Sequence, residues 1–135
     1  MLDLKERINC FTLILYDDNE SYLNYDKIIS IIKSPSFYSC KYYCIKHNLD
    51  TDENGVIKKE HYHLLIKLEN AISIEKIVKT LDNENFNCIV NGLSIVKSFK
   101  GYVRYLVHYD DKNKYQYDIS NIDTNDKNLM YYFNN

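Results

Sequence analysis

Apolar residues recur along this chain with two periods, that of a β-strand and that of an α-helix. Residues 8–16 are apolar on both alternating faces, which is typical of a strand in the middle of a sheet. Residues 37–47 alternate and are rich in tyrosine. Residues 61–68 also alternate, so that His61, His63, Leu65 and Lys67 share one face and the intervening apolar residues share the other, core-facing one. Asn54-Gly55, between these two runs, predicts a tight turn.

Three further segments carry apolar or tyrosine residues at the helical spacing i, i+3, i+4 and i+7: residues 25–32, 74–81 and 102–109. Ser21 and Ser73 are candidate N-caps of the first two helices, and the first is predicted to have about three turns. Residues 88–90 and 93–99 look like short strands, and Asn91-Gly92 between them predicts a hairpin or a bulged strand. The polar, weakly periodic residues after 118 are expected to form a loose tail.

The predicted order of elements is β-α-β, repeated, with an additional helix, which is typical of a split β-α-β sandwich. The predicted fold class is therefore α+β: an antiparallel sheet of ferredoxin-like topology, with helices packed on one face and an active site on the open face. The 135 residues are enough for one domain. We expect that domain over residues 1–118, and a polar C-terminal tail or the start of a missing segment over 119–135.

Composition narrows the class of protein. The chain is 45% hydrophobic and 27% charged, with 3 glycines and 1 proline, which excludes fibrous and low-complexity proteins. Its longest apolar runs are far shorter than the roughly 20 residues that cross a bilayer. The first of these runs also lacks the flanking pattern and the cleavage site of a signal peptide. We therefore predict a cytoplasmic protein with no membrane partner.

Cysteine spacing and net charge bear on two further functions. The 4 cysteines form no Cys-x-x-Cys pair, which disfavours a zinc ribbon and predicts reduced, buried thiols. The formal net charge is −2, so no broad basic face is expected. Any nucleic-acid binding would have to come from a local patch.

Three of the 4 histidines bracket the loop between residues 47 and 61. His61 and His63 share a strand face, about 7 Å apart, so that both imidazoles can bind one metal ion. His47 ends the preceding strand, and Asp50 adds a carboxylate, with Glu53 and Glu60 as alternatives. Three imidazoles and one carboxylate suit Mn²⁺, Co²⁺ or Zn²⁺ better than Ca²⁺.

Three motifs in this chain resemble those of one enzyme family. Lys59-Glu60-His61-Tyr62-His63-Leu64-Leu65 resembles the two-histidine motif of HUH endonucleases, specifically the replication initiators of small rolling-circle plasmids. His47-Asn48-Leu49-Asp50 is similar to the upstream His-x-x-Asp of some plasmid initiators. Arg104-Tyr105-Leu106-Val107-His108, followed by Lys114-Tyr115-Gln116-Tyr117, is similar to the motif that carries the nucleophilic tyrosine. The resemblance covers about residues 8–118, with the motifs in the family's order.

The resemblance implies a site-specific DNA endonuclease and strand transferase. Tyr105, with His108 beside it, would attack a phosphate of origin DNA with the help of Mn²⁺ or Mg²⁺ held by the residues named above. The products would be a 5′-phosphotyrosine and a free 3′-OH that primes rolling-circle replication by host replication proteins. Because a paired duplex cannot reach this geometry, the DNA should be single-stranded or in a hairpin loop. Helical spacing does not choose among Tyr102, Tyr105 and Tyr109, but the motif favours Tyr105.

Further residues are candidates for DNA contacts. Tyr43 shares the alternation of His47 and is a candidate for stacking on a base, with core packing as the alternative. Seven basic residues are candidates for backbone contacts, although each is also an ordinary surface charge: Lys58, Lys59, Lys97, Lys100, Arg104, Lys112 and Lys114.

Two features depart from the family, and other functions stay open. Many members have lysine where His108 stands, and this chain shows no counterpart of the C-terminal oligomerisation or helicase segment, so oligomers are expected only through a missing segment. An RNA-recognition-type binding module would share the topology but would carry aromatics in place of His61 and His63. A structural or regulatory domain would use Tyr105 as a core residue. A relaxase or a single-strand transposase would share the chemistry, but relaxases usually carry a third histidine in the central motif.

Overall fold

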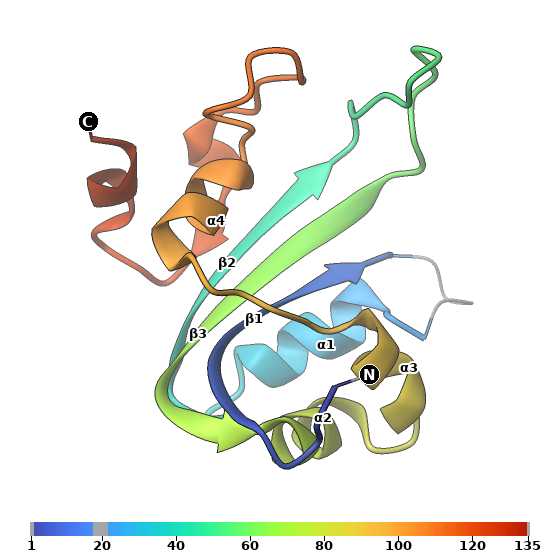
Figure 1. Cartoon of the computed structure of the whole chain (residues 1–135), viewed down its shortest axis with the longest axis vertical. Coiled ribbons are helices and arrows are strands. Elements are labelled where there is room, and N and C mark those ends of the chain that lie inside the picture. The colour runs from blue at the N-terminus through green and yellow to red at the C-terminus, as the bar shows by residue number, and fades with distance from the viewer. Residues whose placement is uncertain (1, 18–21, 135) are drawn as a thin grey trace.

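The computed structural model describes residues 2–17 and 22–134 (Figure 1). Within them, one antiparallel sheet has the strand order β4-β1-β3-β2-β5. The strands are β1 (Arg7–Leu15), β2 (Cys40–His47), β3 (His61–Ser73), β4 (Ser94–Ile95) and β5 (Asp123–Thr124). The helices are α1 (Tyr25–Ile32), α2 (Ile74–Asp82), α3 (Phe86–Gly92) and α4 (Phe99–Tyr105), with 3₁₀ turns η1 (Ile119–Asn121) and η2 (Leu129–Phe133). The predicted α+β class and its antiparallel sheet are confirmed.

The alternation of β3 divides the sheet into two faces. Leu64, Ile66 and Leu68 pack in one core with side chains of α1, α2 and α3. Leu65 belongs to a second cluster on the opposite face, together with Val103 of α4. Figure 1 accordingly shows α1, α2 and α3 on one side of the sheet and α4 on the other. The faces assigned to β3 from its sequence are therefore correct.

Polar side chains set where the first two helices begin. Ser73 Oγ accepts the N–H of Lys76 at 3.3 Å, which confirms Ser73 as the cap of α2. The cap of α1 is Asn24, whose Oδ1 accepts the N–H of Lys27 at 3.0 Å. Ser21, the predicted cap, lies outside the described residues, and α1 with its 8 residues is nearer two turns than three. None of the described helices has the length and apolar character needed to cross a membrane.

The prediction of a hairpin or bulged strand over residues 88–99 is wrong for the first half of this segment. Residues 86–92 form α3, and only Ser94–Ile95 pair with β1. Phe86, Ile89 and Val90 follow the helical spacing i, i+3 and i+4 and face the core. A Cβ at Gly92 would lie 2.9 Å from Cδ1 of Leu23. Gly92 therefore ends a helix at a close contact, and does not form a hairpin turn.

The C-terminal residues 122–133 are packed, which corrects the prediction of a loose tail. β5 pairs with β2, and the buried side chains of Ile122 and Phe133 join the cluster of Val103 and Leu106. This segment and α4 together cover part of the sheet face that α1, α2 and α3 leave open. In the sequence, its apolar residues are Ile122 and the short run 129–133, and they show neither the two-residue period of a strand nor the spacing of a helix.

Asn125 completes the outer edge of β2 with its side chain. Its Oδ1 accepts the N–H of Tyr42, and its Nδ2 donates to the carbonyl of Cys40, each at 3.0 Å. The amide group thus satisfies two backbone groups that a neighbouring strand would otherwise have to pair.

Candidate active site

The β2–β3 hairpin brings together three histidines that the sequence separates. His47 pairs with His61 across the two strands, and His63 lies two residues farther along the same face of β3. The ring centroids lie 4.2 Å apart for His47 and His63, 5.0 Å for His61 and His63, and 5.5 Å for His47 and His61. The three imidazoles therefore form one cluster, as the alternation predicts.

Asp50 joins this cluster from the loop after β2. Its Oδ2 lies 3.1 Å from Nδ1 of His47 and 3.5 Å from Nε2 of His61. The four residues His47, Asp50, His61 and His63 each offer one ligand atom, and these atoms all lie within 4.8 Å of one another. Of the alternative carboxylates, Glu60 pairs with Lys46 at 3.1 Å. The predicted donor set is thus assembled, and we call these four residues the cation cluster.

Hydrogen bonds to the backbone place the imidazole protons away from Asp50. Because a carbonyl oxygen only accepts, Nε2 of His47 donates to Leu106 O at 2.7 Å, and Nδ1 of His61 donates to Lys59 O at 2.9 Å. In the neutral rings, Nδ1 of His47 and Nε2 of His61 then hold lone pairs that face the Asp50 carboxylate. Lone pairs that converge with a carboxylate, each ring fixed through its other nitrogen, fit a bound divalent cation.

The ionisation of the cation cluster suits the same ligand. Burial lowers the pKa of His47 and lowers that of His63 to about 3, so both rings are neutral at pH 7. Burial raises the pKa of Asp50, but the hydroxyl of Tyr117 and the imidazole of His47 outweigh it and hold that pKa below its ordinary value. Nδ1 of His63 is buried without a hydrogen-bond partner among the described residues. Imidazole nitrogens and a carboxylate oxygen are the ligand types that Mn²⁺ and related ions bind.

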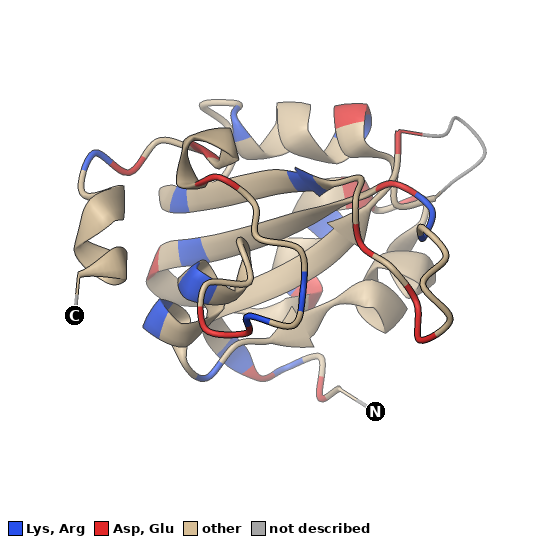
Figure 2. Cartoon of the chain, turned by 90° about the horizontal axis from the view of Figure 1, so that it is seen from above, with Lys and Arg blue, Asp and Glu red and all other residues tan. Residues whose placement is uncertain are grey.

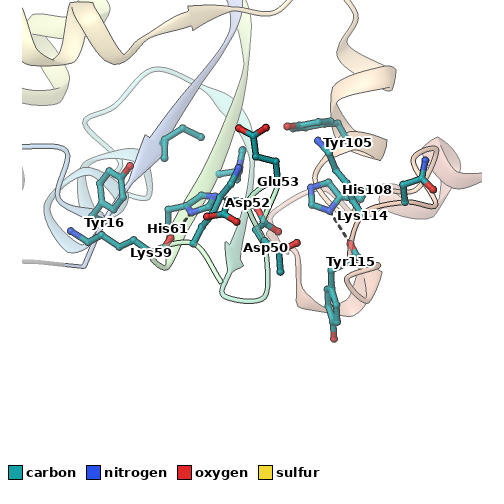
Figure 3. Close-up of a pocket in the computed structure, with 15 residues that line it drawn as sticks. Tyr16, Asp50, Asp52, Glu53, Lys59, His61, Tyr105, His108, Lys114 and Tyr115 are labelled. Atoms are coloured by element: carbon teal, nitrogen blue, oxygen red, sulfur yellow. Dashed lines mark hydrogen bonds and ion pairs between the residues drawn. The ribbon is translucent and has the colours of Figure 1, made fainter. Parts of the chain in front are cut away.

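Tyr105 lines the same pocket as three members of the cation cluster. The pocket has a volume of about 690 Å³ and includes Asp50, His61, His63, Tyr105 and His108 in its wall. Figure 3 shows Tyr105 and His108 on one side of it and His61 on the other. Tyr105 is the last residue of α4 and is 40% exposed, and its ring centroid lies 6.0 Å from that of His63. Its side chain is therefore open to a ligand in the pocket.

His108 is held beside Tyr105 by an unusual backbone conformation. Its φ is 59°, in the left-handed region that few residues other than glycine adopt. Nδ1 of His108 donates to the carbonyl of Tyr115 at 2.8 Å, which leaves the lone pair of the neutral ring on Nε2. The ring centroids of His108 and Tyr105 lie 5.6 Å apart. The Nε2 atom of this buried ring is therefore a hydrogen-bond acceptor beside Tyr105.

The two other tyrosines of the same helical stripe point away from the pocket. The hydroxyl of Tyr102 lies 3.1 Å from Oγ1 of Thr12, against the sheet. The hydroxyl of Tyr109 donates to the carbonyl of Phe133 at 3.3 Å, in the C-terminal segment. The fold thus separates three tyrosines that helical spacing leaves equivalent, and of the three it places Tyr105 beside the histidines.

Comparison with known proteins fits this arrangement. Residues 3–129 match the family described as plasmid replication protein, origin binding domain. The chain belongs to this family. It is 44% identical over 71 residues to a replication protein of Staphylococcus aureus, and 36% identical over 78 residues to the replication protein RepB of Lactiplantibacillus plantarum. These matches cover 53% and 58% of this chain and 34% of each relative, so the chain spans about a third of their length. The predicted resemblance to plasmid replication initiators is confirmed.

The basic residues of this origin-binding domain divide into two groups. Lys58, Lys59 and Lys114 line the pocket, and Nζ of Lys114 lies 5.2 Å from the ring centroid of Tyr105. Lys97 lines an adjacent groove of about 350 Å³ that shares Tyr105. These four lysines therefore lie around the two hollows that Tyr105 lines.

The other three predicted contacts are engaged elsewhere. Nζ of Lys100 lies 5.9 Å from the ring centroid of Tyr131, Arg104 pairs with Asp110, and Nζ of Lys112 lies 4.9 Å from the ring centroid of Tyr109. In Figure 2, basic and acidic residues alternate over the origin-binding domain and do not gather into one basic face. The wall of the pocket itself carries three carboxylates, Asp50, Asp52 and Glu53, beside its three lysines.

Tyr43 is a correction to the predicted DNA contacts. Its side chain is completely buried in the core beneath α4, and its hydroxyl donates to Oδ2 of Asp126 at 2.5 Å. No face of the ring is open to a base in this origin-binding domain. Strand alternation correctly gave the face of the sheet, but it could not show that the C-terminal segment covers that part of it.

Sequence reasoning gave no role to Tyr117, which contacts two members of the cation cluster. Its hydroxyl donates to Asp50, and its ring stacks on His47. The residue lies at the end of the third motif, but its spacing from His47 and Asp50 carries no structural signal. Its position depends on the path of the loop after α4, which includes the positive φ of His108.

Proposed function

We propose that this domain nicks one strand of a plasmid replication origin, with Tyr105 as the nucleophile. The observation that carries the proposal is the pocket itself, which joins an exposed tyrosine, a buried imidazole and three of the four members of the cation cluster. Membership of the origin-binding family supports origin DNA as the substrate. The activity of the full-length relatives extends to this chain only through this proposal.

In the proposed reaction, Tyr105 is the nucleophile and His108 transfers the proton. The Oη of Tyr105 bonds to phosphorus, and the bond between phosphorus and the 3′ oxygen breaks. The phenol proton passes to Nε2 of His108, which can return it through water to the leaving 3′ oxygen. The products are a 5′-phosphotyrosine and a free 3′-OH. Because the aryl phosphate keeps the strand activated, a later hydroxyl can displace the tyrosine and rejoin the strand.

A tyrosine hydroxyl with an ordinary pKa near 10 is a poor nucleophile at pH 7, so the phosphate has to be activated. His47, Asp50, His61 and His63 would hold a divalent cation such as Mn²⁺ or Mg²⁺. When bound, this cation supplies Lewis acidity at a phosphate oxygen. Lys58, Lys59 and Lys114 place further positive charge along the pocket wall.

The shape of the pocket favours unpaired DNA as the substrate. Tyr105 lies across the pocket from His61 (Figure 3), and Asp50 and His63 also line the pocket, so the scissile phosphate has to enter between Tyr105 and these residues. A paired and stacked strand cannot bring its phosphate into such a site without distortion. We therefore propose single-stranded or hairpin-loop origin DNA, whose new 3′-OH host replication proteins extend. This rolling-circle role would place the protein in the cytoplasm.

Trapping the protein–DNA adduct tests the proposal. The chain is incubated with Mn²⁺ and a labelled library of single-stranded oligonucleotides, and the adduct is mapped by peptide sequencing. We expect the nucleotide on the peptide that contains Tyr105, no adduct with Tyr105→Phe, and adducts with the matched variants Tyr102→Phe and Tyr109→Phe. Binding of DNA without an adduct would favour an RNA-recognition-type binding module. An adduct at Tyr102 would reject the nucleophile assignment.

A further inference from the structure

We propose that Tyr117 is a positioning residue for the cation cluster, and that it couples this cluster to the helix that carries Tyr105. The inference rests on the proposed function. It is based on three contacts of the buried side chain of Tyr117.

The first two contacts belong to the hydroxyl of Tyr117. It donates a hydrogen bond to Oδ1 of Asp50 at 2.6 Å and accepts the backbone N–H of Leu49 at 3.1 Å. Because Oδ1 is engaged in this way, the other carboxylate oxygen, Oδ2, is turned toward His47 and His61. Tyr117 thus selects which oxygen of Asp50 a cation would meet.

The third contact belongs to the ring of Tyr117. It stacks on the imidazole of His47 with the centroids 4.4 Å apart and an angle of 2° between the planes. His47 is also fixed at its edge, since Nε2 donates to Leu106 O. The stacking of Tyr117 on the face of the imidazole and the hydrogen bond at its edge together fix the plane of the ring, and therefore the direction of the Nδ1 lone pair.

The same residue is tied to the end of α4. The N–H of Tyr117 donates to the carbonyl of Val107 at 3.3 Å, and the side chain of Gln116 donates to the carbonyl of His108 at 2.8 Å. These bonds fold the loop back onto the residues that follow Tyr105. Since Tyr117 is 8% exposed, water does not compete strongly for its contacts. The loop therefore sets the distance between the nucleophile helix and the cation cluster.

Tyr115 provides a matched control from the same loop. It lies two residues before Tyr117 and is 49% exposed, and its hydroxyl has no hydrogen-bond partner among the described residues. Its ring touches that of Tyr117, with the centroids 4.8 Å apart, but it does not reach Asp50 by a hydrogen bond. Removing its hydroxyl changes the same residue type without changing the proposed contact.

The test is Mn²⁺ binding by the full chain in the absence of DNA, measured by calorimetry. Tyr117→Phe keeps the ring and removes the hydroxyl, and we expect it to weaken Mn²⁺ binding by about tenfold or more. Tyr115→Phe should bind Mn²⁺ as the wild type does. Thermal unfolding of each variant without metal is recorded alongside, because a purely structural role would lower the melting temperature and leave the affinity of the folded protein unchanged. Such a result would overturn the inference.

A double variant tests whether the effect passes through Asp50. Asp50→Asn alone should weaken Mn²⁺ binding, and adding Tyr117→Phe should weaken it little further, since both changes break the same link. If the loss of Mn²⁺ affinity in the double variant equalled the sum of the losses in the two single variants, the inference would be contradicted. Because these experiments contain no DNA, they can succeed even when no covalent adduct forms. A wild-type chain that does not bind Mn²⁺ would overturn both the cation cluster and the role of Tyr117.

Discussion

His47 and Leu106 join the two halves of the site through one hydrogen bond. Nε2 of His47 donates to the carbonyl of Leu106 at 2.7 Å, and Leu106 directly follows Tyr105. A member of the cation cluster is therefore anchored to the backbone that positions the proposed nucleophile. Catalytic groups held by such contacts need little rearrangement when a ligand enters.

Removing one member of the cation cluster should weaken metal binding. We expect His63→Ala to lower the affinity for Mn²⁺ by more than about tenfold, because even an outer hydrogen-bond partner of a ligand is worth about that much. Calorimetric titration should give one site per wild-type chain. Glu53→Gln is the matched control, since Glu53 lines the pocket outside the cluster. Equal Mn²⁺ binding by the wild type and His63→Ala would rule out the assigned ligands.

Binding of single-stranded DNA should depend on salt through the pocket lysines. For single strands, each phosphate contact adds about 0.7 to the slope of log affinity against log salt. Lys58→Ala and Lys114→Ala should each reduce that slope by about this amount in fluorescence anisotropy. Lys100→Ala and Lys112→Ala, on residues engaged elsewhere, should leave it nearly unchanged.

Efficient nicking of relaxed, fully paired linear DNA would contradict the proposed substrate.

The buried pair of Tyr43 and Asp126 should contribute to stability. Tyr43→Phe leaves Oδ2 of the buried Asp126 carboxylate without its hydrogen-bond donor, and we expect a loss of about 1–3 kcal/mol in the free energy of unfolding. Denaturant unfolding measures this loss. Tyr42→Phe, on the neighbouring and less buried tyrosine, should cost less than about 0.5 kcal/mol. Losses of the same size in the two variants would show that the hydrogen bond to Asp126 contributes nothing.

The lowered pKa of Asp126 gives a prediction for how the stability of the protein changes at low pH. Burial raises its pKa, but the hydrogen bond from Tyr43 and the neighbouring Asn128 and Lys41 outweigh burial and hold that pKa below the ordinary 3.8. Below pH 4 the unfolded chain therefore binds a proton that the folded chain does not, and the free energy of unfolding falls as the pH falls. Asp126→Asn should show a shallower decline. Parallel stability curves for the wild type and this variant between pH 5 and pH 2 would be the contrary result.

Local patterns were sufficient for the elements that build the cation cluster. The two-residue period of β3 gave the face of His61 and His63, and the serine before α2 gave the start of that helix. Both signals are local, since strand alternation and helix capping depend on neighbouring residues. The juxtaposition of His47 with His61 followed from the turn at Asn54-Gly55, where Gly55 has a φ of 79°.

Features decided by distant contacts were not predictable in the same way. α3 is short, and its helical form depends on the burial of Ile89 against the core; the sequence pair Asn91-Gly92 favoured a turn. The C-terminal segment is polar along the chain, yet Phe133 packs against α4. Helical spacing did not distinguish Tyr105 from Tyr109, although the motif favoured Tyr105. The fold adds a physical difference, because the C-terminal segment supplies the acceptor that turns Tyr109 away.

The side-chain amide of Asn125 has a consequence for how copies of this domain can meet. Exposed strand edges recruit other chains by backbone pairing, which leads to aggregation. Here β5 and Asn125 occupy the outer edge of β2. At the opposite edge of the sheet, the strand β4 has only 2 residues. Copies of this domain that meet at either edge would therefore find little open strand with which to join their sheets. Asn125→Ala would reopen two backbone groups on that edge and make it the first place to look for self-association.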